Sequence, residues 1–510
     1  MAKAIMLQGT SSHVGKSILT TALCRIFKQD GMKVTPFKAQ NMALNSYVTK
    51  SGGEMGRAQV AQAEAAGLDP AVEMNPVLLK PTGNSCSQVI VMGKAVGNMS
   101  AKEYHAGYSL KALGVVTECL QKLNKDFDVI VIEGAGSPAE VNLKDNDIVN
   151  MRIAKLAPSP VLLIADIDRG GALASVVGTL ELLAPDERDL VKGIIINKFR
   201  GDISLLQPAL EFLEAKTGKP VVGVVPHLDR LGIDDEDSVS LEDKQQSVKT
   251  GELDVAVLRL PKISNFTDFD ALANESDVRV RYVRQGEAIG KPDLIILPGS
   301  KNTTEDLLYL RHHGYETEII KLAKSGTPIV GICGGYQMLG REVQDPEHTE
   351  SDLDKIMGLG LIDSITIFAA DKVTHQVKAK AKHHNFLGIS YSGENLTGYE
   401  IHMGRTQFLT PVDPAFTITT RSGAAVDMAD GAVSPDGLVM GTYMHGVFDN
   451  DVYRRAVLDA LRLRKGLAPL GVVQDTQALK DAAYNRLADV VRKSMDMDLV
   501  YRIMNESAGK

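Results

Sequence analysis

Short apolar runs alternate with helical patterns along the first 230 residues of the chain. Apolar runs of this kind are typical of strands buried on both faces, and their alternation with helices predicts crossover units and a parallel sheet. Helices are expected at 18–27 and 56–67. The expected strands cover residues 4–7, 31–38, 75–83, 87–92, 126–133, 159–166, 191–198 and 219–226.

A second pattern of the same kind begins near residue 252. It has expected strands at 254–258, 278–282 and 293–297, a strand and helix within 327–339, and a strand at 437–448, with amphipathic helices at 453–463 and 478–504. Because 510 residues exceed one ordinary core, two domains are expected. The pattern predicts an α/β fold with two doubly wound domains, divided into a first domain at 1–230, an acidic linker at 231–251, a second domain at 252–450 and a helical tail at 451–510.

The bulk composition narrows the class of function. A formal net charge of -8 argues against nucleic acid as the main partner. The four cysteines show no paired metal spacing, which indicates a reducing compartment, and the start of the chain has too short an apolar run for a secretory signal. No stretch has the length of a membrane span. We expect a cytoplasmic protein without a membrane partner, for which a homo-oligomer stays open.

Residues 8–17, with the sequence QGTSSHVGKS, join the first expected strand to the first expected helix. Gly9 and Gly15 let successive backbone N–H groups point inward, as a phosphate-binding loop requires. Lys16 can reach the outer phosphates, and the Ser17 hydroxyl can bind Mg²⁺. ATP and Mg²⁺ are therefore the expected cofactors. The expected ATP-binding residues are Gly9, Thr10, Ser11, Ser12, Gly15, Lys16, Ser17 and, at the end of a later strand where many phosphate-loop proteins read the base, Asn197.

Further polar residues are expected at the carboxyl edge of the same sheet, where ligands of open α/β sheets bind. The apolar strand 126–133 ends in Glu133, which we expect to join Ser17 at the metal, although a carboxylate at a strand end can also cap the next helix. Lys38 ends the second strand, and the polar segment 39–46 after it fits either substrate contacts or a solvated loop.

Cys333 lies in a sharp glycine turn between a strand and a helix, the pattern of a nucleophile elbow with cysteine in the place of serine. A thiolate nucleophile needs a base, and His445 at the end of strand 437–448 is the candidate, with His402 as its competitor. The backbone amides of Gly334 and of Gly299 with its neighbour are the natural donors to an oxyanion.

These motifs resemble known families over nearly the whole chain. The first half resembles the dethiobiotin synthetase group of phosphate-loop ligases, on its glycine-first loop and on Glu133-Gly-Ala-Gly136. The second half resembles a class I glutamine amidotransferase, on the Cys333 elbow and His445. The two together are similar to the cobyrinic acid amidating enzymes of corrin biosynthesis. The resemblance implies that Cys333 attacks the amide of glutamine, that His445 protonates the departing ammonia, and that ammonia passes to the first domain.

Five motifs in the same order resemble one branch of that family, at 8–12, 37–45, 75–83, 166–171 and 399–404. This branch carries out four ATP- and glutamine-dependent amidations, at the b, d, e and g carboxylates of adenosylcobyrinic acid a,c-diamide, and gives adenosylcobyric acid. The resemblance implies a corrinoid substrate and L-glutamine as partners. The substrate site is then expected to include Lys38, Gln40, Asn41, Tyr399 and His402.

Two alternatives stay open from the sequence. The other branch, the a,c-diamide synthases, differs in substrate and stops after two amidations, and its usual Gly-Pro-Asp-Tyr-type segment after the second strand is absent here. A partition-type ATPase with an inactive amidotransferase-like module belongs to a different class, and the intact Cys333 and His445 oppose it.

The chain also departs from the patterns that it resembles. Ordinary class I amidotransferases carry a Glu two residues after the histidine, whereas this chain has Val447, a lack that the resembled family shares. We therefore expect a Cys-His pair whose histidine is positioned by another group, with slower or partner-dependent hydrolysis of glutamine. His13 stands where many relatives have an acid, which leaves Ser17 and Glu133 to serve the metal.

Overall fold

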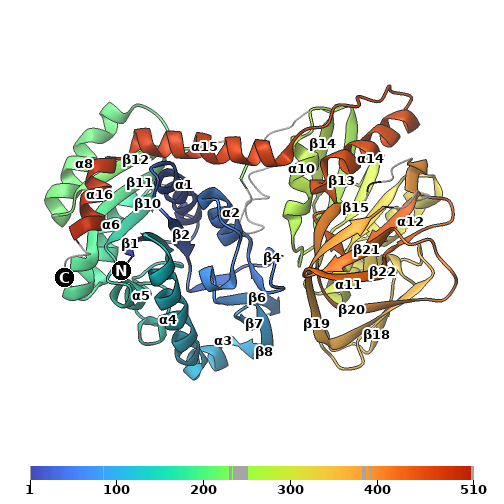
Figure 1. Cartoon of the computed structure of the whole chain (residues 1–510), viewed down its shortest axis with the longest axis horizontal. Helices are drawn as coiled ribbons and strands as arrows, with labels where there is room; N and C mark the ends of the chain where they lie inside the picture. The colour runs from blue at the N-terminus through green and yellow to red at the C-terminus, as the bar shows by residue number, and fades with distance from the viewer. Residues whose placement is uncertain are drawn as a thin grey trace.

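The computed structural model describes residues 2–83, 85–228, 232–233, 251–381, 386–389, 393 and 395–506. It has two α/β domains side by side (Figure 1). The predicted fold class, two doubly wound domains, is confirmed. The acidic segment predicted at 231–251 lies almost wholly outside the described residues. In the described part of the chain, none of the helices combines the length and apolar character needed to cross a bilayer.

The first domain is built on a six-stranded parallel sheet in the order β12-β11-β10-β1-β9-β2. Successive side chains of each strand enter different cores: Met6 packs on one face, while Ile5 and Leu7 pack on the other. Burial on both faces explains why these strands are continuous apolar runs. The strands are β1 (Lys3–Gly9), β2 (Val34–Phe37), β9 (Val129–Glu133), β10 (Val161–Asp166), β11 (Val191–Phe199) and β12 (Val221–Pro226).

Helices cover both faces of this sheet, as its double winding requires (Figure 1). On one face α1 follows the phosphate loop directly and packs beside α2. The helices of the domain are α1 (Lys16–Gln29), α2 (Arg57–Ala66), α3 (Ala101–Glu103), α4 (Ser109–Asp126), α5 (Met151–Leu156), α6 (Ala172–Leu182), α7 (Pro185–Leu190) and α8 (Ile203–Thr217).

Two small sheets lie between the main sheet and the second domain. The strands predicted at 75–83 and 87–92 exist, but they form an antiparallel hairpin in a separate four-stranded sheet instead of joining the parallel one. The segment 39–46, predicted as a loop, contains one short strand and the start of another. These strands are β3 (Gln40–Met42), β4 (Ser46–Val48), β5 (Glu54–Gly56), β6 (Val77–Gly83), β7 (Cys86–Val91) and β8 (Lys94–Ser100).

The second domain has a six-stranded sheet in the order β14-β13-β15-β16-β24-β23, in which only β23 is antiparallel. The strands are β13 (Leu253–Leu258), β14 (Val278–Val283), β15 (Leu294–Leu297), β16 (Ile329–Ile332), β23 (Ala432–Val433) and β24 (Val439–Thr442). The helices are α10 (Asp270–Asn274), α11 (Thr303–His312), α12 (Tyr315–Lys324) and α13 (Gly334–Leu339).

A second sheet of this domain faces the first domain, and its long strands β19 and β20 pair antiparallel. The single strand predicted at 437–448 was wrong, because the chain passes from one sheet to the other: β24 ends at Thr442, and β25 pairs with β20. The strands of this sheet are β17 (Glu342–Gln344), β18 (Lys355–Met357), β19 (Ser364–Lys380), β20 (Leu396–Phe408), β21 (Phe416–Arg421), β22 (Ala424–Asp430) and β25 (Met444–His445).

The C-terminal helices contact both domains. Helix α14 (Asp451–Arg464) packs on the core of the second domain, and α15 (Thr476–Ser494) returns across the top of Figure 1 to pack against α1. The helix predicted at 478–504 is two helices, because the chain breaks at Met495, which bridges to Gly223 of the first domain. Helix α16 (Met497–Glu506) then completes the chain's cover of the first sheet.

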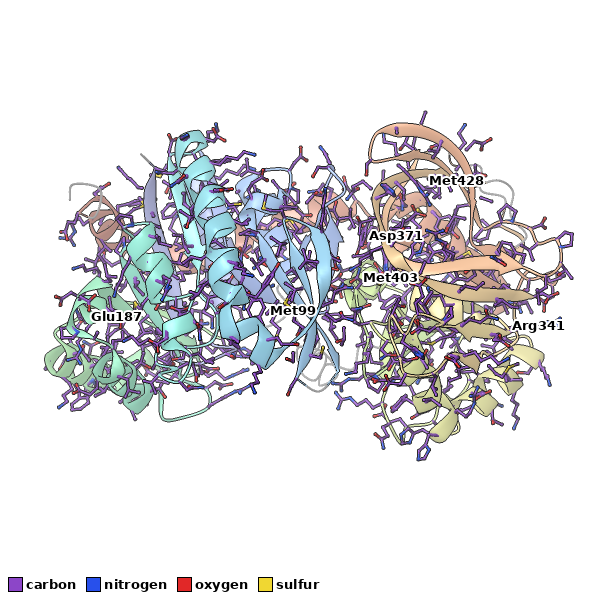
Figure 2. The ribbon with its side chains drawn as sticks, turned by 90° about the horizontal axis from the view of Figure 1, so that it is seen from below. Met99, Glu187, Arg341, Asp371, Met403 and Met428 are labelled. Carbon is purple, nitrogen blue, oxygen red and sulfur yellow. The ribbon has the colours of Figure 1, made fainter. Side chains whose placement is uncertain are left out.

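The hairpin of β4 and β5 and the residue before it form hydrogen bonds with the second domain. The backbone amide of Ser46 donates to Asn265 Oδ1 at 3.2 Å, and Asn45 Oδ1 accepts from the amide of Phe266 at 3.2 Å. Thr374 Oγ1 on β19 donates to the carbonyl of Gly52 at 2.8 Å. Figure 2 shows this boundary from below, with Met99 on the first domain's side and Met403 and Asp371 on the other.

Candidate functional sites

The loop between β1 and α1 has the conformation that its glycines permit. Gly15 has φ +96°, and a Cβ there would lie 2.1 Å from Nδ2 of Asn197, so both the left-handed backbone and the close approach require glycine. A Cβ at Gly9 would lie 3.0 Å from the ammonium of Lys16. That ammonium donates to the carbonyls of Ser11 at 3.0 Å and Gly136 at 3.1 Å, across the mouth of the loop.

Strand β11 supports the loop from behind. Asn197 Nδ2 donates to the carbonyl of Val14 at 2.7 Å, and Lys198 Nζ donates to the carbonyl of His13 at 2.7 Å. The predicted ATP-binding residues therefore lie together at one place. Thr10 continues from β1 with its amide on the carbonyl of Ile164, and the Ser11 and Ser12 side chains are exposed at the loop.

Glu133 is the centre of a buried cluster below the phosphate loop and is 1 % exposed. Its Oε1 accepts from Ser17 Oγ and from Lys38 Nζ, both at 2.8 Å, and its Oε2 accepts from Gln62 Nε2 at 2.6 Å. The paired hydroxyl and carboxylate are oxygen donors of the kind Mg²⁺ prefers, so these residues fit a metal that is otherwise bound by phosphates and water. Among the described residues, no group of three or more Asp, Glu, His or Cys side chains is placed to hold a metal ion.

Gln40 and Asn41, which we predicted to face the substrate, are held by neighbours in the first domain. Gln40 Oε1 accepts from the Tyr104 hydroxyl at 2.5 Å, and Asn41 Nδ2 donates to Gln59 Oε1 at 3.0 Å. Gln59 lies on α2, one turn before Gln62.

Cys333 has the strained backbone of a nucleophile elbow, with φ +51° and ψ -109° between β16 and α13. The turn is tight: a Cβ at Gly335 would lie 2.0 Å from the carbonyl oxygen of Leu297, and one at Gly331 would lie 2.7 Å from the carbonyl oxygen of Gly335. The thiol points at the carbonyl of Ile401 on β20, with Sγ and O 3.4 Å apart.

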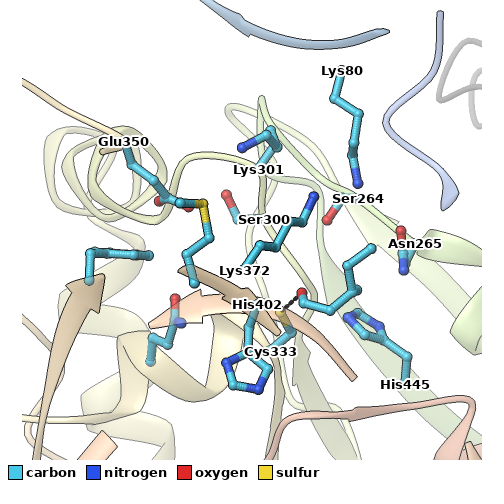
Figure 3. Close-up of a pocket in the computed structure, with 14 residues that line it drawn as sticks. Lys80, Ser264, Asn265, Ser300, Lys301, Cys333, Glu350, Lys372, His402 and His445 are labelled. Carbon is cyan, nitrogen blue, oxygen red and sulfur yellow. Dashed lines mark hydrogen bonds between the residues drawn. The ribbon is translucent and has the colours of Figure 1, made fainter. Parts of the chain in front are cut away.

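His445 lies in the same pocket as Cys333 and is oriented by an acid (Figure 3). Its Nδ1 donates to Asp268 Oδ2 at 2.7 Å, and Asp268 Oδ1 accepts from the amide of Gly446 at 3.0 Å. Burial lowers the pKa of His445, but the Asp268 carboxylate and the nearby thiol outweigh burial and raise the pKa to about 10. Its Nε2 is buried and has no hydrogen-bond partner within the described ranges, which leaves it available to a reactant.

The predicted oxyanion donors meet beside the thiol. A Cβ at Gly334 would lie 2.8 Å from the amide nitrogen of Ser300, so the two backbone segments are in direct contact. Gly299 lies against the imidazole, since a Cβ there would be 3.1 Å from Cε1 of His445. The structure thus brings Gly299, Gly334, Cys333 and His445 together, and Ser300 is the residue whose amide approaches Gly334.

Tyr399 and His402 lie at this second site and not beside Lys38. The ring of Tyr399 stacks on His445 with centroids 5.1 Å apart and planes 15° apart. His402 stacks on Tyr443 at 3.8 Å, and its Nδ1 donates to the carbonyl of Gly404 at 2.8 Å. Burial lowers the pKa of His402 to about 4, so its imidazole is neutral at physiological pH.

The pocket around Cys333 is a cavity of about 40 Å³, enough for a few water molecules and too small for glutamine. Lys80 from the first domain reaches into it, beside Lys301, Lys372 and Glu350 of the second domain (Figure 3). The pocket is therefore closed on one side by the neighbouring domain.

Sequence reasoning missed Asp268, Gln62 and the charged residues of the pocket. Asp268 lies in the segment Phe266-Thr-Asp-Phe269. The available sequence signal was a single acid between two phenylalanines. In the structure both phenylalanines are buried. Gln62 lies in an Ala- and Gln-rich helix, whose sequence alone indicates only a helix packed against its neighbours.

The fold and the two sites define a protein in which a nucleotide-binding domain is fused to a glutamine amidotransferase domain. Residues 5–240 match the family model of the CobQ/CobB/MinD/ParA nucleotide binding domain, and residues 254–453 match that of the CobB/CobQ-like glutamine amidotransferase domain. The chain belongs to the cobyric acid synthase family. It is 57% identical to the cobyric acid synthase of Pelotomaculum thermopropionicum over 99% of this chain and 97% of that protein.

Further relatives are similar to this chain over its whole length. The cobyric acid synthase of Moorella thermoacetica is 56% identical, with 99% of this chain and 98% of the relative covered. That of Desulforamulus reducens is 54% identical, with 100% and 99% covered. The other branch of the amidating family and the partition-type ATPase are not favoured by these likenesses.

Proposed function

We propose that this chain is a glutamine-hydrolysing carbon–nitrogen ligase that amidates the b, d, e and g carboxylates of adenosylcobyrinic acid a,c-diamide, giving adenosylcobyric acid in cobalamin biosynthesis. The observation that carries the proposal is the identity of 54% to 57% with cobyric acid synthases along the full chain. Two separate groups of residues, around Glu133 and around Cys333, support a reaction that uses both ATP and glutamine.

Cys333 is proposed to attack the amide carbon of glutamine. His445 keeps a proton at neutral pH, because its pKa is raised to about 10, and can give it to the departing ammonia. Asp268 holds the imidazole through Nδ1 so that Nε2 points at the reactants. The amides of Gly334 and Ser300 stabilise the oxyanion, and water then hydrolyses the thioester to glutamate.

The first domain is proposed to activate a corrinoid carboxylate with ATP, since hydroxide is a poor leaving group at neutral pH. Gly9, Gly15 and the loop amides bind the phosphates, and Lys16 balances negative charge on the transferred phosphoryl group. When bound by Ser17 and Glu133, Mg²⁺ would supply further charge neutralisation. Ammonia from the second domain then displaces the phosphate.

The corrinoid and L-glutamine are the proposed partners, with no nucleic acid. The four cysteines are free thiols, which suits the reducing cytoplasm that we propose as the compartment.

A count of amides tests the proposal. The protein is incubated to completion with adenosylcobyrinic acid a,c-diamide, ATP, Mg²⁺ and glutamine, and the corrinoid product is analysed by mass spectrometry. Four added amides are expected. Exhaustive turnover that yields no amide on this substrate, but two on cobyrinic acid itself, would identify an a,c-diamide synthase instead. ATP hydrolysis with no amide on either corrinoid would favour the partition-type reading.

A further inference from the structure

The pocket that holds Cys333 also holds charges that its chemistry at sulfur does not use. Three lysines and one glutamate line it: Lys80, Lys301, Lys372 and Glu350. Releasing ammonia from an amide requires a nucleophile, a proton donor and an oxyanion site, and none of these four residues supplies one. Buried charges are expensive unless they are paired or serve a ligand, so their presence needs an explanation.

Two of the lysines are already neutralised by the first domain. Glu54 on β5 accepts from Lys80 Nζ through Oε1 at 2.8 Å and from Lys372 Nζ through Oε2 at 2.6 Å. Lys80 also donates to Ser46 Oγ, and Lys372 donates to Gln88 Oε1 at 2.9 Å. The ammonium groups of Lys80 and Lys372 are therefore both paired with residues of the first domain.

Lys301 differs from the other two lysines. No described residue lies within ion-pair or hydrogen-bond distance of its ammonium, although burial lowers its pKa. It directly follows Ser300, whose amide approaches Gly334, so its side chain leaves the backbone at the oxyanion site. Lys301 is the cation of this pocket that has charge to offer a ligand.

Glu350 provides the opposite charge on the same wall. One carboxylate oxygen, Oε2, accepts from the backbone amide of Thr303 at 3.0 Å, and the structure gives the carboxylate no cationic partner at contact distance among the described residues. Burial raises its pKa to about 7, with the charge of Lys301 acting against that rise. A cation that binds beside Glu350 would therefore be stabilised by its ionised form.

The backbone around this pair is fixed in advance. Asp345 accepts hydrogen bonds from the amides of Thr349, Glu350 and Ser351 at 2.7 to 2.9 Å, which folds the segment that presents Glu350. Asn302 Nδ2 donates to the carbonyl of Glu350 at 3.0 Å and so joins that segment to the one that carries Lys301.

We propose that Lys301 and Glu350 bind the head group of glutamine, Lys301 the α-carboxylate and Glu350 the α-ammonium. An ammonium and a carboxylate on one wall, with the nucleophile on the other, match an α-amino acid whose side-chain amide must reach Cys333 (Figure 3). This inference rests on the proposed glutaminase activity and adds the residues that make it specific for an amino acid. Because the cavity holds only a few waters, side chains that line it must move when glutamine enters.

Analogues of glutamine that lack one of its two charged groups test the roles proposed for Lys301 and Glu350. Glutamine is compared with 5-amino-5-oxopentanoate, which lacks the α-ammonium, and with 4-aminobutanamide, which lacks the α-carboxylate, as substrates or as competitive inhibitors. Lys301→Met should lower kcat/KM for glutamine about 10- to 100-fold and leave the value for 4-aminobutanamide unchanged. Glu350→Gln should show the same loss for glutamine and none for 5-amino-5-oxopentanoate.

Two controls separate the inference from the proposed function. Amidation with free ammonia should be unchanged in both variants, and the exposed Lys291→Met should behave as the wild type with every donor. An equal loss with all three donors, in variants that still use ammonia, would overturn the head-group assignment and leave the proposed function standing. A wild-type protein that releases no ammonia from glutamine would overturn both.

Discussion

The imidazole of His445 and the carboxylate of Asp268 are joined by a 2.7 Å hydrogen bond, although 177 positions separate the two residues in the chain. Both residues are buried, His445 at 1 % and Asp268 at 3 % exposure. The position where ordinary class I amidotransferases have a glutamate is Val447, which packs in the core of the second domain. An acid from a different segment therefore orients the histidine, and the expectation of a histidine positioned by another group has a physical explanation.

Asp268→Asn should change the pH dependence of glutamine hydrolysis. The carboxylate outweighs burial in setting the pKa of His445 at about 10, so its removal should lower that pKa. The imidazolium is then lost at lower pH, and the alkaline limb of the glutaminase profile should move towards neutrality. The rate near neutral pH should fall roughly 10²- to 10⁴-fold, the range for general acid–base groups. Measurement of ammonia release between pH 6 and about 10.5 checks both.

The ammonia-dependent reaction provides the control for this variant. Because free ammonia bypasses Cys333 and His445, amidation with ammonium salts should proceed in Asp268→Asn as in the wild type. A fall in kcat with an unmoved alkaline limb would mean that Asp268 only supports the fold around Gly446.

Ser17→Ala should separate the two half-reactions. The variant removes a hydroxyl that lies 2.8 Å from Glu133 and that we propose binds the metal. Amidation should fall by about 10²-fold or more with glutamine and with ammonia alike, because both depend on ATP. Basal release of ammonia from glutamine should continue, since the Cys333 pocket lies in the other domain.

Titration with a chelator gives an independent test of the metal. Removal of Mg²⁺ should stop amidation in the wild type and leave basal glutaminase unchanged. Amidation that persists without divalent cations would refute the metal role of Ser17 and Glu133.

Tyr399 offers a way to test communication between the two sites. Its ring stacks on His445, and its hydroxyl accepts from Asn265 Nδ2 at 3.0 Å and donates to the carbonyl of Ser46 on the first domain at 3.4 Å. Tyr47 packs edge-on against the same ring, and the guanidinium of Arg57, at the start of α2, lies over Tyr47. The same helix carries Gln62, which bonds Glu133 below the phosphate loop.

Tyr399→Phe should therefore weaken the stimulation of glutaminase by ATP and the corrinoid, by roughly fivefold or more, with little change in basal rate. The ring that stacks on His445 remains, whereas the hydroxyl link to the first domain is lost. Tyr399→Leu should lower the basal rate as well. Tyr309→Phe, on α11, serves as the matched control. Full stimulation in Tyr399→Phe would exclude the hydroxyl from any such link.

The parts of the two sites that could be predicted from sequence are those whose residues are adjacent in the chain. The phosphate loop at 8–17 and the elbow at Cys333 are each a strand, a glycine turn and a helix in succession, so a few residues determine their geometry. Asp268 could not be assigned to His445 in this way, because only the packing of a 3-10 turn at Phe266–Phe269 against β25 brings the two together.

The second sheet of the amidotransferase domain was missed for a different reason. Strand β19 alternates buried and half-buried residues at first, and then carries Lys372, which bonds Glu54 of the other domain. Polar residues that are buried only by a neighbouring domain read as a loop in a single sequence. Lys372 was overlooked for this reason, since its partners Glu54 and Gln88 lie on the opposite domain.

Glu54 stabilises the boundary between the domains, and its removal should be strongly destabilising. It is 1 % exposed and sits between Lys80 and Lys372. Glu54→Gln would leave two buried ammonium groups without a counter-charge, a change that costs about 3–5 kcal/mol. Thermal and urea unfolding should show a lower midpoint. The double variant Glu54→Gln with Lys372→Met should lose less than Glu54→Gln alone, because one of the unmatched charges is gone.

The pH dependence of that stability has a defined sign. Burial by itself raises the pKa of Glu54, but Lys372 and Lys80 outweigh burial and hold the pKa well below its ordinary value. A carboxyl whose pKa is lowered on folding contributes stability above its unfolded pKa of about 4.3, and this contribution is lost as the pH falls below that value. Between pH 5 and pH 3 the wild type should therefore lose more stability than Glu54→Gln. Equal losses in the two proteins would mean that folding does not lower the pKa of Glu54, because the predicted difference arises from a carboxyl that is protonated in the unfolded chain and stays ionised in the folded one.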